Sequence, residues 1–132
     1  MEYTIRFRNN SNFCLAGVLH SPVEHSNAGI IFLHGFAGKK DENGLFPYAA
    51  NILSQNGYHA LRFDFAGAGE SQGDYLQSTL KSQKNDFLSA VDFFIKRCSL
   101  NKVGVIGFSL GATIALLGYN RRIKAMALWS PA

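Results

Sequence analysis

Cysteine, proline and charged residues are scarce in this chain of 132 residues, and long apolar runs are missing. Cys14 and Cys98 lie far apart and form no CxxC pair, so they indicate reduced thiols rather than a metal or redox site. With 47% hydrophobic and 17% charged residues, the composition excludes a disordered, collagen-like or coiled-coil chain. No apolar stretch approaches the roughly 18 residues of a membrane span, and segment 1–6 alternates where a secretory signal would be apolar. We therefore expect a single soluble domain in the cytoplasm, with no membrane partner.

Basic residues exceed acidic ones, 13 Lys and Arg against 9 Asp and Glu, which gives a formal charge of +4. They are scattered in small groups such as Lys39–Lys40 and Lys96–Arg97. A nucleic-acid surface would gather them in one stripe interleaved with aromatic residues. We expect no nucleic-acid partner, and we expect the surplus charge to lie on solvated faces.

The periodicity of the apolar residues predicts six strands and three helices. Alternating or continuous apolar runs predict strands at 3–7, 13–19, 29–33, 58–63, 103–108 and 123–129. Helical spacing appears after residue 45, from about 79 to 97, and from 110 to 119. Two leading strands followed by alternating helices and strands indicate an α/β fold, with an open, mostly parallel sheet and helices on both faces.

The first predicted helix carries apolar residues at helical spacing along one face, and Asn56–Gly57 is expected to end it because glycine adopts the left-handed conformation there. The residues of that face are Leu45, Tyr48, Ala49, Ile52 and Leu53.

The strongest motif is the G-x-S-x-G sequence from Gly107 to Gly111, with a strand before it and a helix after it. In that setting the central Ser109 sits on a sharp, strained turn, and side chains at Gly107 and Gly111 would clash with their neighbours. The N-terminus of the following helix favours negative charge on a bound acyl oxygen. The alternative is an ordinary strand-to-helix turn in which the serine side chain caps the helix.

A second motif, His34-Gly35-Phe36, follows the buried strand 29–33 directly. If that strand lies beside strand 103–108, then Phe36 and Ser109 emerge next to each other at the ligand-binding edge of the sheet. The backbone amides of Phe36 and Leu110 would then form an oxyanion hole, each donor contributing about 3 kcal/mol to transition-state stabilisation. We interpret His34 as a structural, hydrogen-bonded residue rather than a catalytic base.

A glycine-rich loop after the strand 58–63 raises the possibility of a dinucleotide site. The spacing does not fit, because Gly73 comes one position too late after Gly67 and Gly69, and no apolar helix opens there. We expect Asp64 instead to hold its own loop in place through hydrogen bonds.

Four stretches, 33–38, 61–71, 107–111 and 127–132, together resemble the N-terminal half of an α/β-hydrolase, and are similar in particular to the cinnamoyl and feruloyl esterases. The resemblance implies Ser109 as the nucleophile, the amides of Phe36 and Leu110 as the oxyanion hole, small carboxylic esters as substrates, and no metal or cofactor. It also implies that residues 1–132 form one partial domain of about six strands, without the later strands, the cap insertion, the triad acid or the triad histidine.

All four histidines precede Ser109, and no Asp, Glu or His follows it. In the resembling fold the acid and the histidine come after the serine. A serine without a base is a weak nucleophile, so we expect this chain alone to be inactive or very weak.

Two other hypotheses stay open: a non-catalytic module for binding or dimerisation, and a complete enzyme in which His34 or Asp64 replaces the base. The apolar strand 123–129 would end the sheet, so we also expect self-association through its edge. Aromatic residues near the expected crevice would suit an apolar acyl group or belong to the core; they are Phe36, Phe65, Tyr75 and Phe108.

Overall fold

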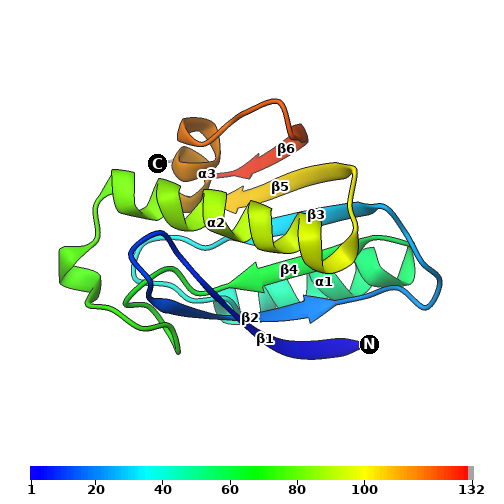
Figure 1. Ribbon diagram of the computed structural model, residues 1–132, viewed down its shortest axis with the longest axis horizontal. Coiled ribbons are helices and arrows are strands. Elements are labelled where there is room, and N and C mark those ends of the chain that lie inside the picture. The colour runs from blue at the N-terminus through cyan, green and yellow to red at the C-terminus, as the bar shows by residue number, and fades with distance from the viewer. Residues whose placement is uncertain (131–132) are drawn as a thin grey trace.

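The computed structural model describes residues 1–130, which form one open six-stranded sheet with helices packed on both faces (Figure 1). The strands are β1 (Glu2–Arg8), β2 (Cys14–His20), β3 (Ala28–Leu33), β4 (His59–Phe63), β5 (Lys102–Phe108) and β6 (Ile123–Trp129). The helices are α1 (Leu45–Gln55), α2 (Leu80–Cys98) and α3 (Leu110–Leu117), with short 3-10 turns η1 (Glu42–Gly44) and η2 (Tyr75–Gln77). The predicted elements are confirmed, with bounds shifted by a few residues at most.

The sheet has the order β1-β2-β4-β3-β5-β6. The pairs β1–β2 and β2–β4 are antiparallel, whereas β4–β3, β3–β5 and β5–β6 are parallel. The predicted open, mostly parallel sheet is therefore confirmed. Because β3 lies between β4 and β5, the strand order reverses at β3, and ligand sites of open α/β sheets lie at the carboxyl ends of strands around such a point.

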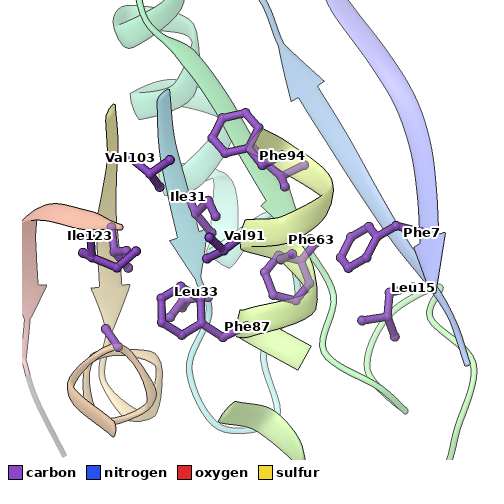
Figure 2. Packing of buried hydrophobic residues seen from close by; sticks show 14 of the residues in the cluster. Phe7, Leu15, Ile31, Leu33, Phe63, Phe87, Val91, Phe94, Val103 and Ile123 are labelled. Carbon is purple, nitrogen blue, oxygen red and sulfur yellow. The ribbon is translucent and has the colours of Figure 1, made fainter. Parts of the chain in front are cut away.

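The larger part of the core lies between the sheet and the helices α2 and α3 (Figure 2). Phe87, Val91 and Phe94 of α2 are fully buried there, and Ile114 of α3 joins the same cluster. The sequence begins α2 sharply, because the Thr79 side chain and Ser82 form a reciprocal capping box. The long helix α2 thus covers this face of the sheet with a wide apolar stripe.

The opposite face is covered by α1, and there the predicted packing face is partly wrong. Phe46 and Ala50 are buried against Phe32 and Ala60 of the sheet. Leu45, Tyr48 and Ile52 are instead exposed, although they share the helical spacing. The helix is oriented so that Phe46 fills the space above the sheet, and three of the five residues of the expected face point outward. The predicted helix end is confirmed, since Gly57 has a φ of +90°.

β6 lies at the edge of the described sheet, paired on one side with β5. Pro131 and Ala132, which end the stretch 127–132 used for the family resemblance, lie outside the described residues. Within residues 1–130, no helix has the length and apolar character needed to cross a membrane.

Candidate active site

Ser109 stands at the junction of β5 and α3 in a backbone conformation that L-residues rarely adopt. Its φ is 56° and its ψ is −116°. Its side chain makes no capping hydrogen bond to α3, which argues against the alternative of a plain helix cap. The backbone is locked on both sides, because the Ser109 amide donates to the Trp129 carbonyl at 2.8 Å and the Ser109 carbonyl accepts from Ala112 at 3.0 Å. A strained polar residue held in this way is typical of a functional site.

The two glycines of the motif are required by close packing. A Cβ on Gly107 would stand 2.7 Å from the Ala112 Cα, and a Cβ on Gly111 would overlap the Leu33 carbonyl oxygen. Both contacts are with backbone, which cannot swing aside as a side chain can. The α3 N-terminus is thereby pressed against the end of β3, and this brings Ser109 next to the turn that follows β3.

The turn after β3 lies directly beside Ser109. β3 and β5 pair in parallel with Leu33 opposite Gly107, and a Cβ on Gly35 would lie 3.3 Å from the Ser109 Cβ. Within residues 1–130, neither the Phe36 amide nor the Leu110 amide donates a hydrogen bond to another protein group. Among the described residues, the turn after β3 and the start of α3 thus each leave one backbone donor without a protein partner close to the strained serine.

His34 is buried beneath this turn with both ring nitrogens engaged. Its Nδ1 lies 2.8 Å from the Gly35 carbonyl, and its Nε2 accepts the Phe65 amide at 3.2 Å. This pairing requires the neutral ring with the proton on Nδ1, and burial keeps the pKa of His34 below its usual range. A histidine held in this way has no nitrogen free to take a proton from Ser109.

Glu42 and Tyr75 hold the backbone on either side of Phe36. A carboxylate oxygen of Glu42 accepts the Gly35 amide at 2.8 Å, and the Tyr75 hydroxyl accepts the Ala37 amide at 3.0 Å. Ala37 has a φ of 56°, so the turn needs such support.

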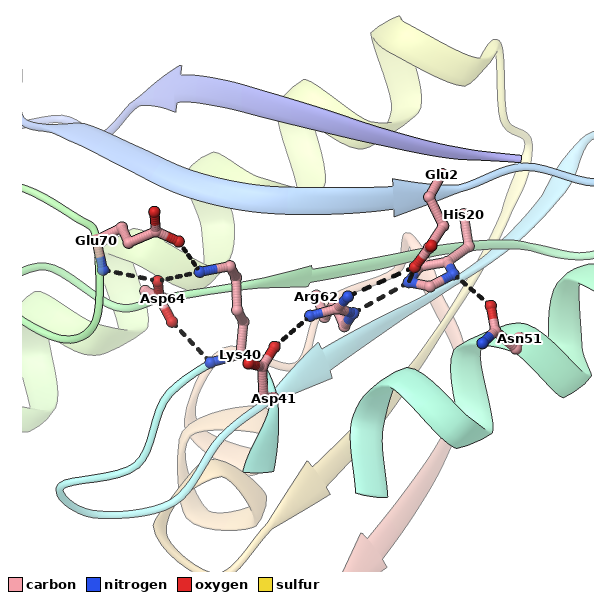
Figure 3. Close-up of polar contacts among 8 residues, drawn as sticks. All are labelled: Glu2, His20, Lys40, Asp41, Asn51, Arg62, Asp64 and Glu70. Carbon is pink, nitrogen blue, oxygen red and sulfur yellow. Dashed lines mark hydrogen bonds and ion pairs between the residues drawn. The ribbon is translucent and has the colours of Figure 1, made fainter. Parts of the chain in front are cut away.

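A buried ion pair fixes the next part of the same loop (Figure 3). Asp64, which has no exposed surface, accepts the Lys40 amide at 2.6 Å and the Lys40 ammonium at 2.9 Å. The Glu70 amide donates to the same carboxylate at 3.0 Å, and the Glu70 carboxylate accepts from the Lys40 ammonium at 2.6 Å. Although burial acts to lower it, hydrogen bonds to Glu70 and Asp64 raise the pKa of Lys40. The expectation that Lys40 lies on a solvated face is wrong, because the Asp64 carboxylate draws it inward.

A second set of buried polar residues links the loop after β3 to β2 and α1 (Figure 3). Arg62 of β4 donates to Asp41 at 2.6 Å and to the ring of His20 at 3.0 Å. The other ring nitrogen of His20 pairs with Asn51 of α1 at 3.0 Å. Burial, followed by the charge of Arg62, lowers the pKa of His20 and keeps this ring neutral. Two consecutive residues of the loop after β3 are therefore attached to this part of the sheet: Lys40 to Asp64, just after β4, and Asp41 to Arg62 of β4.

A cavity of about 380 Å³ opens beside the two free amides. Of the four aromatic residues considered from the sequence, Phe36 and Tyr75 line it, with ring centroids 5.8 Å apart. Phe65 belongs to the buried core, and Phe108 packs against the cluster under α1. Phe36 and Tyr75 thus line the cavity, whereas Phe65 lies in the core and Phe108 packs against it.

Glu42 and Arg62 take part in this region without a role predicted from the sequence, and Tyr75 was expected near the crevice but not as a hydrogen-bond partner of the turn after β3. A signal for one part was present, since Lys39 to Glu42 form a run of four charged residues in a chain with 17% charge, in the loop that follows a buried strand. Nothing local marks the bond between Tyr75 and Ala37, because the two residues lie 38 positions apart in the sequence.

The open sheet and the strained serine beside the β3 turn define an α/β hydrolase. A family model described as serine aminopeptidase S33 matches residues 24–132, so the chain belongs to this family of hydrolases. The Pyrococcus furiosus esterase Pf2001 is similar in structure, with a TM-score of 0.87 and 25% identity over 99% of this chain and 50% of that chain. Est1E from Butyrivibrio proteoclasticus, solved with ferulic acid, has a TM-score of 0.86 and 26% identity over 96% of this chain and 52% of its own.

Among sequence relatives, an acyl transferase of Shewanella hanedai is 36% identical over 90 residues, which are 67% of this chain and 28% of the relative. A probable alcohol acetyltransferase of Cyberlindnera fabianii is 32% identical over 111 residues, 78% of this chain and 28% of the relative. The chain thus spans about half the length of the two solved structures and less than a third of these two relatives.

Proposed function

We propose that residues 1–132 carry the nucleophile and oxyanion hole of a serine hydrolase acting on small carboxylic esters. Ser109 is the nucleophile, and the amides of Phe36 and Leu110 bind the oxyanion. The observation that carries the proposal is the pair of free amides on both sides of a strained, uncapped serine. The residues assigned a supporting role are His34, Gly35, Asp64, Gly107 and Gly111.

The chemistry begins with attack of the Ser109 hydroxyl oxygen on the ester carbonyl carbon. A base takes the hydroxyl proton while the carbonyl oxygen gains negative charge between the two amides, where each donor is worth about 3 kcal/mol. The carbon–oxygen bond to the alcohol then breaks, and the base returns the proton to the leaving alkoxide. Water attacks the acyl-serine in the second half of the reaction and releases the acid.

Neither His34 nor Asp64 can act as the base that takes the proton from Ser109. Both nitrogens of His34 are bonded, and Asp64 is fully buried against Lys40. Residues 110–132 contain no Asp, Glu or His. We therefore place the acid and the histidine in chain beyond residue 132 or in a second molecule, and not at His34 or Asp64.

Hydrolysis of 4-nitrophenyl butyrate by the whole protein tests this function. We expect turnover that Ser109→Ala lowers by at least a thousandfold, because no other group can form the acyl intermediate. Ser130→Ala, at another exposed serine on the same edge of the sheet, is the matched control and should leave turnover unchanged. Equal rates for the wild type and Ser109→Ala would overturn the proposal and favour a non-catalytic binding module.

Acyl transfer to an alcohol is a second candidate for the same acyl-serine. The relatives described as an acyl transferase and a probable alcohol acetyltransferase favour it. Addition of ethanol during ester cleavage separates the two outcomes. Formation of ethyl butyrate at the expense of butyrate indicates transfer, whereas unchanged butyrate indicates hydrolysis alone.

Self-association is a separate proposal about the polypeptide of residues 1–132. Its support is the position of β6 at the edge of the described sheet, where unpaired backbone groups can pair with another chain. Light scattering after size exclusion should give a dimer or larger species at micromolar concentration. A monomer under those conditions would refute the proposal.

A further inference from the structure

The cavity beside Ser109 has a wall built from both turns of the site. Phe36 and Leu110, the residues whose amides form the proposed oxyanion hole, also line this cavity. An ester carbonyl bound by those two amides would therefore lie against two residues of the cavity lining. The remaining wall comes from the segment before α2 and from its first turn, and includes Tyr75, Leu76, Thr79, Leu80 and Gln83.

The lining of the cavity is mainly apolar. Leu76 and Leu80 are 90% and 51% exposed, and Phe36 is 74% exposed, so three large apolar side chains face solvent around one opening. Single exposed apolar residues are common, but a group of them around a cavity marks a binding site. The volume of about 380 Å³ is at the lower end of the range for small-molecule sites.

Two contacts keep this wall in place. The Tyr75 hydroxyl accepts the Ala37 amide, which ties η2 to the turn after β3. The backbone of Tyr75 also packs so closely on Gly67 that a Cβ there would overlap it. The cavity is thus pre-formed rather than a gap between loose loops.

The side of Ser109 on which the cavity lies determines which half of an ester it can hold. Phe36 follows β3 and the segment 75–83 follows β4, so the cavity lies on the β3–β4 side of Ser109, whereas β6 lies on the other side. The departing alcohol must be next to the base that returns its proton. The family order places the base after the serine in the chain, and a base contributed on the β6 side would have the alcohol leave on that side.

We propose that the cavity between Phe36, Tyr75, Leu80 and Leu110 binds the acyl chain of the ester and selects for medium-length apolar acyl groups. This inference rests on the proposed function for the step that places the alcohol on the β6 side. The binding of an apolar chain in the cavity rests on the lining alone.

A substitution that fills the cavity tests the proposal in the whole protein. Leu80→Trp should lower kcat/KM for 4-nitrophenyl octanoate at least tenfold more than for 4-nitrophenyl acetate, because the longer chain must enter the filled space. Leu116→Trp is the matched control, since Leu116 is similarly exposed at 56% but lies on α3 and does not line the cavity. It should change both esters equally and little. Equal losses for both esters with Leu80→Trp would overturn the proposal.

Binding measured without turnover separates this inference from the proposed function. Calorimetry with octanoate and the Ser109→Ala protein should show binding that Leu80→Trp weakens at least tenfold and Leu116→Trp does not. If that pattern appears without any ester hydrolysis, the apolar site is correct and the proposed hydrolysis is wrong. If hydrolysis depends on Ser109 but octanoate binding ignores Leu80→Trp, the acyl site is wrong and the hydrolase is correct.

Discussion

The two turns that meet at the candidate site are fixed in different ways. The turn after β5 is shaped by backbone packing, because Gly107 and Gly111 leave no room for a side chain. The turn after β3 is shaped by side chains brought from elsewhere, with Glu42 on Gly35, Tyr75 on Ala37 and Asp64 on Lys40. The motif of one half is thus written within five residues and packs against the backbone of β3, whereas the other half depends on side chains that lie far apart in the sequence.

Because the two turns are held by different interactions, they should respond differently to changes in pH, salt and side-chain volume. Packing against backbone is insensitive to pH and salt but cannot absorb an added methyl group. Hydrogen bonds and ion pairs tolerate changes of volume but depend on both partners and on their protonation. The predictions below break the two halves separately, in the whole protein, and run from the largest expected effect to the smallest.

Gly111→Ala should be the most damaging single change. The added Cβ would overlap the Leu33 carbonyl, so β3 and α3 must separate, and we expect the free energy of unfolding to fall by about 4 kcal/mol or more. Denaturant unfolding measures this loss. Gly44→Ala is the control, because a Cβ there meets nothing within 4 Å and only the positive φ of 87° costs about 1 kcal/mol. Similar losses for the two variants would contradict the packing argument.

Lys40→Met should destabilise the turn after β3, which is held by side-chain hydrogen bonds and ion pairs. It keeps the length of the side chain but leaves the fully buried Asp64 carboxylate without its cation, which costs about 3 kcal/mol. Glu70→Gln removes the other, exposed partner of the same ammonium and should cost clearly less, because water screens that ion pair. Unfolding curves for both variants decide the point. An equal cost for the two would mean that burial of Asp64 does not matter.

Ser109→Gly should stabilise the protein relative to Ser109→Ala. Glycine adopts the φ of 56° and ψ of −116° without strain, while alanine keeps the strain of the serine, so we expect a difference of about 1 kcal/mol. Thermal or denaturant unfolding of the two variants measures it. An alanine variant as stable as the glycine variant would show that the turn stores no strain.

The β3 turn should also make stability depend on pH through His34. Because burial keeps its folded pKa below the unfolded value of about 6.5, the unfolded state binds the proton first as pH falls. The free energy of unfolding should therefore drop below pH 6.5, by up to about 1.4 kcal/mol per pH unit for this group. His34→Gln should reduce the slope between pH 7 and pH 5.

Other groups contribute to the same curve and provide the control. Burial lowers the pKa of His20 and His59 as well, and raises that of Asp86, which acts in the opposite direction. These contributions are present with and without His34, so only the difference between the two slopes is interpreted. An unchanged slope in His34→Gln would show that His34 protonates equally in both states.

The same contrast explains how much could be predicted from the sequence. The strands, the helices and the elbow around Ser109 follow from local spacing, and the alternation of elements predicts a mostly parallel sheet. That β3 and β5 are neighbours was only a condition at that point, and the structure shows the pairing. The inward positions of Lys40 and Arg62 could not be predicted, because their partners lie 20 or more residues away and only the sheet order brings them together. The orientation of α1 was also missed, since two apolar faces compete on that helix and the fit of Phe46 against Phe32 decides between them.

The most direct test of the account is a crystal structure of the whole protein after reaction with diethyl 4-nitrophenyl phosphate. The account predicts a phosphoryl group bonded to the Ser109 hydroxyl oxygen, with one phosphoryl oxygen at about 2.7–3.1 Å from both the Phe36 and Leu110 amides. That result would show that the two turns act as one site. A label on another residue, or a phosphoryl oxygen that contacts neither amide, would contradict the account.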